Sequence, residues 1–84
     1  MCSNGVNTGQ FKMMLEQIDD QLALQRRWTH RLAHTAGDAG FEKTDDTLHQ
    51  IQSLLDDARA LITDAKDILE DEAENGSGVT IELV

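Results

Sequence analysis

Proline and tyrosine are absent from this chain of 84 residues, and other aromatic residues are scarce. Without proline, nothing in the sequence prevents long uninterrupted helices. The single cysteine, Cys2, excludes an internal disulfide and is typical of a reducing compartment. With two Phe and one Trp, the apolar surface consists mainly of Leu, Ile and Ala, which favours helix packing over a β-sandwich.

Long apolar segments are also missing. No run approaches the length of a membrane-spanning helix, and residues 1–10 hold no apolar stretch of the signal-peptide kind. We therefore expect a soluble, cytoplasmic protein. A chain of this length forms one domain at most, and a single core of that size is only marginally stable alone.

The net charge of −9 is concentrated in the second half of the chain. Residues 1–43 hold five basic and five acidic residues, whereas residues 44–84 hold eleven acidic residues against Arg59 and Lys66. Such a surface repels phosphate backbones, so direct nucleic-acid binding is disfavoured. A basic protein surface would be attracted to it.

The first half of the chain predicts a flexible leader over residues 1–9 and a helix over residues 10–36, with Thr8 as a candidate N-cap. One face of this helix collects residues spaced alternately four and three apart, which is typical of an amphipathic helix. The predicted seam consists of Phe11, Leu15, Ile18, Leu22, Gln25, Thr29, Leu32 and Ala36, with Met14 and Trp28 on one flank.

The clearest break in the chain is the segment 37–40, which begins and ends with glycine. We expect Gly37 to take the left-handed position that ends a helix, and Phe41 to fold back as an apolar plug under the loop. A second helix is expected over residues 45–74. Its candidate N-caps are Thr44, Asp45 and Asp46. The predicted fold class is all-α, an antiparallel two-helix hairpin.

The second helix carries three apolar rows, each with a seven-residue repeat. The first row is Leu48, Leu55, Ile62 and Leu69; the others are Ile51, Ala58 and Ala65, and Leu54, Leu61 and Ile68. Three rows make a face wider than one partner helix can cover. We therefore expect two hairpins to complete a four-helix bundle through an oligomer face of Leu48, Leu54, Leu55, Leu61, Ile62, Ile68 and Leu69.

The last ten residues, 75–84, begin with the hinge Asn75-Gly76-Ser77-Gly78. Val79, Ile81 and Leu83 then alternate with polar residues, which predicts a short strand-like tail. A lone strand has nothing in this chain to pair with, so the tail is expected to be disordered or to add to a sheet elsewhere.

Three histidines are candidate metal ligands, and in an antiparallel hairpin Asp45 and Asp46 lie close to two of them. His30 and His34 have the spacing that lets two imidazoles share a metal, and His49 comes level with His34 in an antiparallel hairpin. The first two fall away from the predicted seam, and no Glu or Cys completes a known ligand pattern. The preferred interpretation is three solvated side chains, with metal binding as the alternative. No phosphate loop or catalytic cluster occurs, so no cofactor and no catalytic residue is predicted.

Two surfaces are candidates for binding a partner protein. Trp28 beside Arg27 and Arg31 is a candidate hot spot, although its place next to the seam favours a flank of the core. A run of acids opposes the helix dipole at the end of the second helix, which favours the interpretation that a basic partner meets it. A solvated face is the alternative. The acids proposed for binding are Asp64, Asp67, Glu70, Asp71 and Glu74.

The position of the turn predicts which charged residues lie opposite each other in the hairpin. If the turn centres near residue 40, residues whose numbers add to about 81 lie level, so Arg26 and Arg27 come opposite Asp56 and Asp57.

Size, acidity and helical content are typical of small phage and plasmid inhibitors and of small adaptor proteins. The sequence thus indicates a non-enzymatic protein that binds its own copy and a basic partner. The alternatives are a nucleic-acid mimic, an oligomeric small-ligand sponge around Arg26, Arg27, Arg31 and Trp28, and an enzyme subunit whose active site lies elsewhere.

Overall fold

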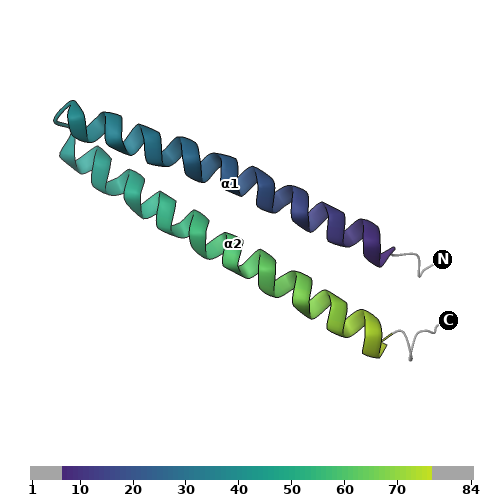
Figure 1. The fold of residues 1–84 in the computed structure, drawn as a ribbon. Coiled ribbons are helices and arrows are strands. Elements are labelled where there is room, and N and C mark those ends of the chain that lie inside the picture. Colours follow the sequence, from purple (N-terminus) through teal and green to yellow (C-terminus); the bar gives the residue numbers. More distant parts are fainter. Residues whose placement is uncertain (1–6, 77–84) are drawn as a thin grey trace.

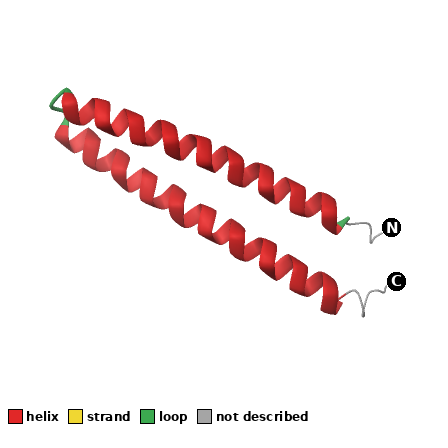
Figure 2. Cartoon of the chain, viewed as in Figure 1, coloured by secondary structure: helices red, strands yellow, loops and turns green. Residues whose placement is uncertain are grey.

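The computed structural model describes residues 7–76 as two antiparallel α-helices joined by a tight turn (Figures 1 and 2). α1 spans Thr8–Asp38 and α2 spans Glu42–Gly76. The start of α1 and the end of α2 lie at the same end of the hairpin (Figure 1). The prediction of an all-α hairpin is confirmed. The strand-like tail predicted from Val79 onwards lies outside the described residues.

α1 begins earlier than the sequence suggested. The side chain of Asn7 accepts a hydrogen bond from the backbone N–H of Gln10 at 3.1 Å. Asn7 therefore occupies the N-cap position, and Thr8 is the first helical residue. The prediction of Thr8 as the cap is wrong by one position, because Asn and Thr are both good caps and the earlier of the two is used.

The turn is a Schellman motif centred on Gly40. Gly40 has a φ of +86°, in the left-handed region, and its N–H donates to the carbonyl of Gly37 at 3.1 Å. The N–H of Phe41 donates to the carbonyl of Ala36 at 2.8 Å. The prediction that Gly37 ends the helix is wrong, because Gly37 lies inside α1. There its missing side chain makes room for Asp45, whose Oδ2 would lie 2.8 Å from an added Cβ.

α2 begins at Glu42, before the residues predicted to cap it. The carbonyl of Phe41 accepts the first helical hydrogen bond from the N–H of Asp45 at 2.9 Å. Thr44, Asp45 and Asp46 are therefore helical residues, and the acids Glu42 and Asp45 in the first turn suit the positive end of the helix dipole. Phe41 is 64% exposed and forms no plug under the loop.

The contact between the helices is narrow. Among the described residues only Ala33 and Ala36 are buried, next to the turn. Their small side chains let the helices approach closely there. Farther along, the apolar row of α2 is half-buried against α1, and it consists of Leu48, Leu55, Ile62 and Leu69.

The predicted seam of α1 contains two rows of residues, and only one of them faces α2. In that row Leu15, Leu22 and Thr29 are half-buried and Ala36 is buried. The second predicted row is exposed, by 45% to 56% for its apolar members, and consists of Phe11, Ile18, Gln25 and Leu32. In its place α1 turns a row that is mostly charged towards α2: Lys12, Asp19, Arg26 and Ala33.

We expect Gly40→Ala to lower the free energy of unfolding by about 1–2 kcal/mol, because a Cβ is strained in the left-handed conformation. Gly40→Asn should lose less, since Asn tolerates that conformation better. Urea unfolding followed by circular dichroism at a fixed protein concentration measures both. Equal stability of the parent and the alanine variant would contradict the assigned turn.

Candidate functional site: an ionic face and an open apolar face

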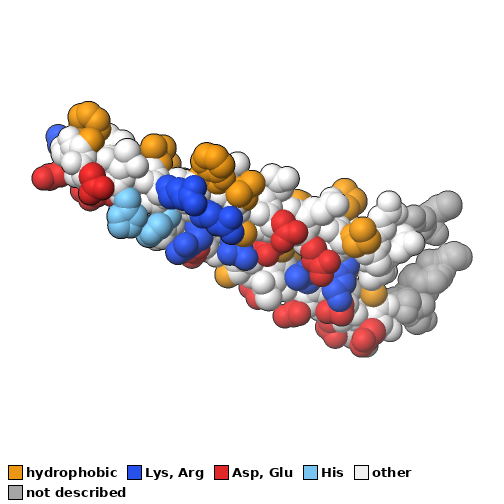
Figure 3. Space-filling model, turned by 45° about the horizontal axis from the view of Figure 1, so that its top comes forward, with side chains coloured by type: hydrophobic (Ala, Val, Ile, Leu, Met, Phe, Trp, Pro, Cys, Tyr) orange, Lys and Arg blue, Asp and Glu red, His pale blue; other side chains and the backbone are white. Residues whose placement is uncertain are grey.

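Among the residues that the structure describes, four ion pairs between α1 and α2 lie along one side of the hairpin. They are Lys12–Glu70 at 3.0 Å, Glu16–Lys66 at 3.8 Å, Asp19–Arg59 at 3.0 Å and Arg26–Asp56 at 2.7 Å. Basic and acidic side chains lie next to one another on the face of the molecule that Figure 3 shows. We call this side the ionic face. The predicted opposition of Arg26 and Asp56 is confirmed, whereas Arg27 and Asp57 are both exposed and form none of these pairs.

Asp19 and Arg59 form a bidentate pair on the ionic face. The guanidinium donates two hydrogen bonds to the carboxylate, Nε to Oδ1 at 3.0 Å and Nη2 to Oδ2 at 3.3 Å. This fork lowers the pKa of Asp19, chiefly through the hydrogen bond, and raises the pKa of Arg59. At the open end, the hydrogen bond from Lys12 to Glu70 raises the pKa of Lys12.

These pairs explain why the seam differs from the predicted one. Turning α1 by one row brings Lys12, Asp19 and Arg26 against charges of opposite sign on α2. The alternative would bury Phe11, Ile18 and Leu32 but leave Gln25 in the contact and the charges unpaired. Apolar periodicity alone does not separate the two choices. The signal in the sequence was the matching of charges across the predicted register.

The three histidines lie together on the ionic face, near the turn (Figure 3). His30 Nδ1 lies 3.0 Å from Gln52 Oε1, and the Nε2 atoms of His30 and His34 are 3.1 Å apart. His49 Nδ1 lies 2.8 Å from Asp45 Oδ1. His34 and His49 are exposed, as the interpretation of solvated side chains expects, whereas His30 is half-buried. Within the described part of the chain, no three or more His, Cys, Asp or Glu residues are arranged to hold a metal ion.

The opposite side of the hairpin is apolar and uncovered. On each helix a mostly apolar row begins three residues after the seam row, whereas the ionic row begins four residues after it. Because two antiparallel helices rotate in opposite senses when viewed from one end, equivalent rows of both helices fall on the same side. We call this side the open face. Its large apolar residues are Phe11, Met14, Ile18, Trp28, Leu32, Ile51, Leu54, Leu61 and Ile68.

Residues of the predicted oligomer face divide between two environments. Leu48, Leu55, Ile62 and Leu69 face α1, whereas Leu54, Leu61 and Ile68 belong to the open face.

Trp28 stands at the outer margin of the open face and is 61% exposed. The preferred interpretation of Trp28 as a flank of the core is therefore wrong. Arg27 and Arg31, its predicted companions in a binding surface, are exposed on the outer side of α1.

The predicted acidic site lies at the open end of the hairpin, where the segments 8–20 and 59–74 come together. They hold nine acidic and three basic residues, a net charge of −6. Glu70 pairs with Lys12, while Asp64, Asp67 and Glu72 are exposed. Asp71 and Glu74 are exposed as well, and each takes part in an interaction.

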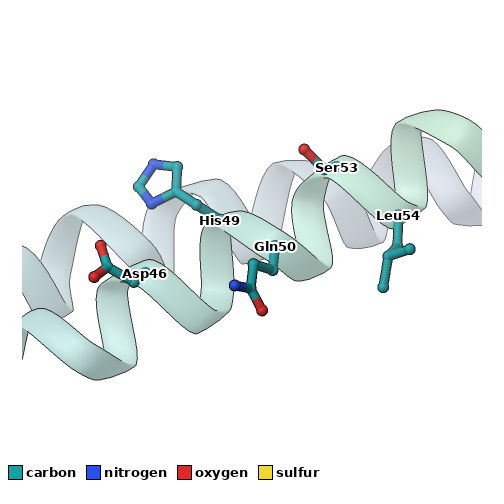
Figure 4. A pocket seen from close by; sticks show the side chains of 5 residues that line it. All are labelled: Asp46, His49, Gln50, Ser53 and Leu54. Atoms are coloured by element: carbon teal, nitrogen blue, oxygen red, sulfur yellow. The ribbon is translucent and has the colours of Figure 1, made fainter.

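One surface depression, of about 500 Å³, lies on the outer side of α2 (Figure 4). It is lined by Asp46, His49, Gln50, Ser53 and Leu54, whose side chains point in different directions (Figure 4). A ligand site needs polar groups that converge on one point of a concave wall, and the polar groups that line this depression do not converge.

Neither helix is long and apolar enough to cross a membrane, within the described residues. Comparisons with protein-family models, curated proteins and solved structures found no match. The class of the molecule is therefore defined by its own geometry: a two-helix hairpin with one ionic and one apolar face.

Acid titration should reveal the pair Asp19–Arg59. Because its pKa is lowered in the folded state, Asp19 contributes stability that is present above the unfolded pKa of about 4 and is lost as the pH falls through the folded pKa. Between about pH 5 and pH 2, the parent should therefore lose more stability than Asp19→Asn.

Urea unfolding at each pH measures this difference. Asp57→Asn is the matched control, because it removes an exposed carboxylate outside the four cross-helix pairs. Its stability should depend on pH in the same way as that of the parent. If Asp19→Asn loses as much stability on acidification as the parent does, Asp19 does not stabilise the fold through Arg59.

Proposed function

We propose that this chain is a non-enzymatic protein-binding protein that pairs with a second copy through its open face and meets a basic partner through its acidic end. The observation that carries the first part is the open face itself. Nine large apolar side chains, each 41–66% exposed, run along both helices on one side. Monomeric proteins rarely leave a continuous apolar patch larger than a few hundred Å² in water.

The size of the open face suits a second copy of the hairpin. Its nine large side chains expose on the order of 1,000 Å² of mostly apolar surface, which is about what one partner contributes to a standard stable interface. A hairpin placed on it by a twofold axis would complete a four-helix bundle. The ionic face would remain in water, where its charges are best solvated.

Small and polar residues on the open face support a specific pairing. Ala58 and Ala65 alternate with larger side chains along α2 and allow a neighbouring helix to approach closely. Gln25 interrupts the apolar row of α1 midway between Ile18 and Leu32. A polar residue at such a position disfavours registers that bury it unpaired, as it does in coiled coils.

The acidic end supports the second part of the proposal. The open end has a net charge of −6, whereas the part nearer the turn, residues 21–58, has −2. The acids stand at the C-terminal end of α2, which has no basic residue in its last turn. They therefore oppose the helix dipole, and a basic partner surface would relieve both effects.

The pairing of two hairpins is tested by adding one charge to the open face. We expect the parent to sediment as a dimer at micromolar concentration. Leu61→Asp should be a folded monomer, because the dimer would have to bury an unpaired carboxylate. Ala60→Asp is the matched control, since Ala60 is the exposed neighbour on the outer side of α2. It should remain dimeric.

Leu55→Asp distinguishes the two apolar environments of α2. Leu55 faces α1, so this change should unfold the hairpin itself, which circular dichroism would detect. A monomeric parent with a cooperative thermal transition would refute pairing through the open face.

The basic partner is tested by neutralising acids that leave the Lys12–Glu70 pair intact. In Asp64→Asn, Asp67→Asn and Glu72→Gln combined, the fold should persist, with stability unchanged or slightly raised because the dipole conflict is reduced. Association with a partner captured from host lysate should be slower and less dependent on salt than for the parent.

Equal rates and equal salt dependence would show that the acids are only a solvated surface. A duplex DNA competitor is added in a parallel measurement. Competition by DNA would favour the alternative of a nucleic-acid mimic over a partner that recognises a protein surface.

A further inference from the structure

The pair His30 and His34 is the group of reactive side chains on the ionic face that the proposed function does not use. The two residues lie one helical turn apart on α1, and their ring centroids are 4.5 Å apart. Their Nε2 atoms are 3.1 Å apart. Two ring nitrogens at this distance repel each other unless a proton, or another cation, lies between them.

The separation of the two nitrogens suits a transition-metal ion. Metal–imidazole bonds are about 2.0–2.1 Å long, so two nitrogens 3.1 Å apart subtend an angle of about 100° at a shared ion. This angle lies between the values for cis positions of an octahedron and for a tetrahedron. The helix backbone supplies the spacing, so little rearrangement is needed for chelation.

Gln52 prepares His30 for this role. Its amide oxygen lies 3.0 Å from His30 Nδ1, which must therefore carry a proton and donate it. In the neutral imidazole this leaves the lone pair on Nε2, the atom that faces His34. Histidines that bind metals commonly donate their second ring N–H to a protein oxygen in this way, which fixes the tautomer.

We propose that His30 and His34 chelate one divalent transition-metal ion of the kind that prefers imidazole, such as Ni²⁺ or Zn²⁺, through their Nε2 atoms. The ion replaces the proton shared by the two rings, and water molecules fill the remaining coordination positions. His49 is outside this chelate, because its ring centroid lies 6.5 Å from that of His30 and its Nδ1 faces Asp45. The site thus has two protein ligands, consistent with the lack of a three-ligand group among the described residues.

The test is a calorimetric titration of the full chain with Ni²⁺. A Cys2→Ser background removes the one thiol, which would otherwise compete for the metal. We expect one ion per chain. His34→Gln should lower the affinity about tenfold or more while keeping an N–H donor for His30. His49→Gln should change the affinity less than twofold.

Thermal unfolding provides a second measurement. Because the chelate ties two successive turns of α1 together, Ni²⁺ should raise the unfolding midpoint of the parent but not that of His34→Gln. His34 is exposed, so its substitution should leave the hairpin folded, which circular dichroism checks. The proposal is overturned by a lack of saturable binding up to millimolar Ni²⁺. It is also overturned if His49→Gln loses as much affinity as His34→Gln, or if the binding stoichiometry is half an ion per chain.

Discussion

Two helices meet along a single line, and this geometric limit governs the rest of the molecule. The apolar residues of α2 occupy three rows, but α1 covers only the row that contains Leu55 and Ile62. Only two alanines in the described chain are buried, so the hairpin has little core of its own. The apolar surface that remains is therefore the strongest physical reason for expecting a second chain.

Charge decides which surface remains. Each exposed ion pair contributes little to stability, but four pairs in one register all favour the same rotation of α1. The fork between Asp19 and Arg59 is the most directional of them. Turning charged residues towards α2 moves Phe11, Ile18 and Leu32 to the opposite side. The same rotation of α1 about its axis therefore produces both the ionic face and the open face.

This division gives each surface a separate chemical role. In the proposed pairing, the open face is covered by a second hairpin, while the ionic face remains accessible to water and ions. The histidine pair lies on the accessible side, so the proposed metal site and the proposed pairing can succeed or fail independently. Charge is also unevenly distributed along the hairpin. The open end carries most of the negative charge, whereas Arg26, Arg27 and Arg31 lie nearer the turn.

Much of the architecture was determined by the sequence alone. The seven-residue repeat of Leu48, Leu55, Ile62 and Leu69, the glycine-flanked break and the absence of proline together specified two long antiparallel helices. The position of the turn near residue 40 placed Arg26 opposite Asp56, and the ion pair between them confirms this register. Only the tertiary structure decided which of two adjacent rows of α1 faces α2, and hence that Trp28 is exposed and that His30 bonds to Gln52. Local periodicity is nearly the same for both rotations, and the difference lies in contacts between residues that are distant in the chain.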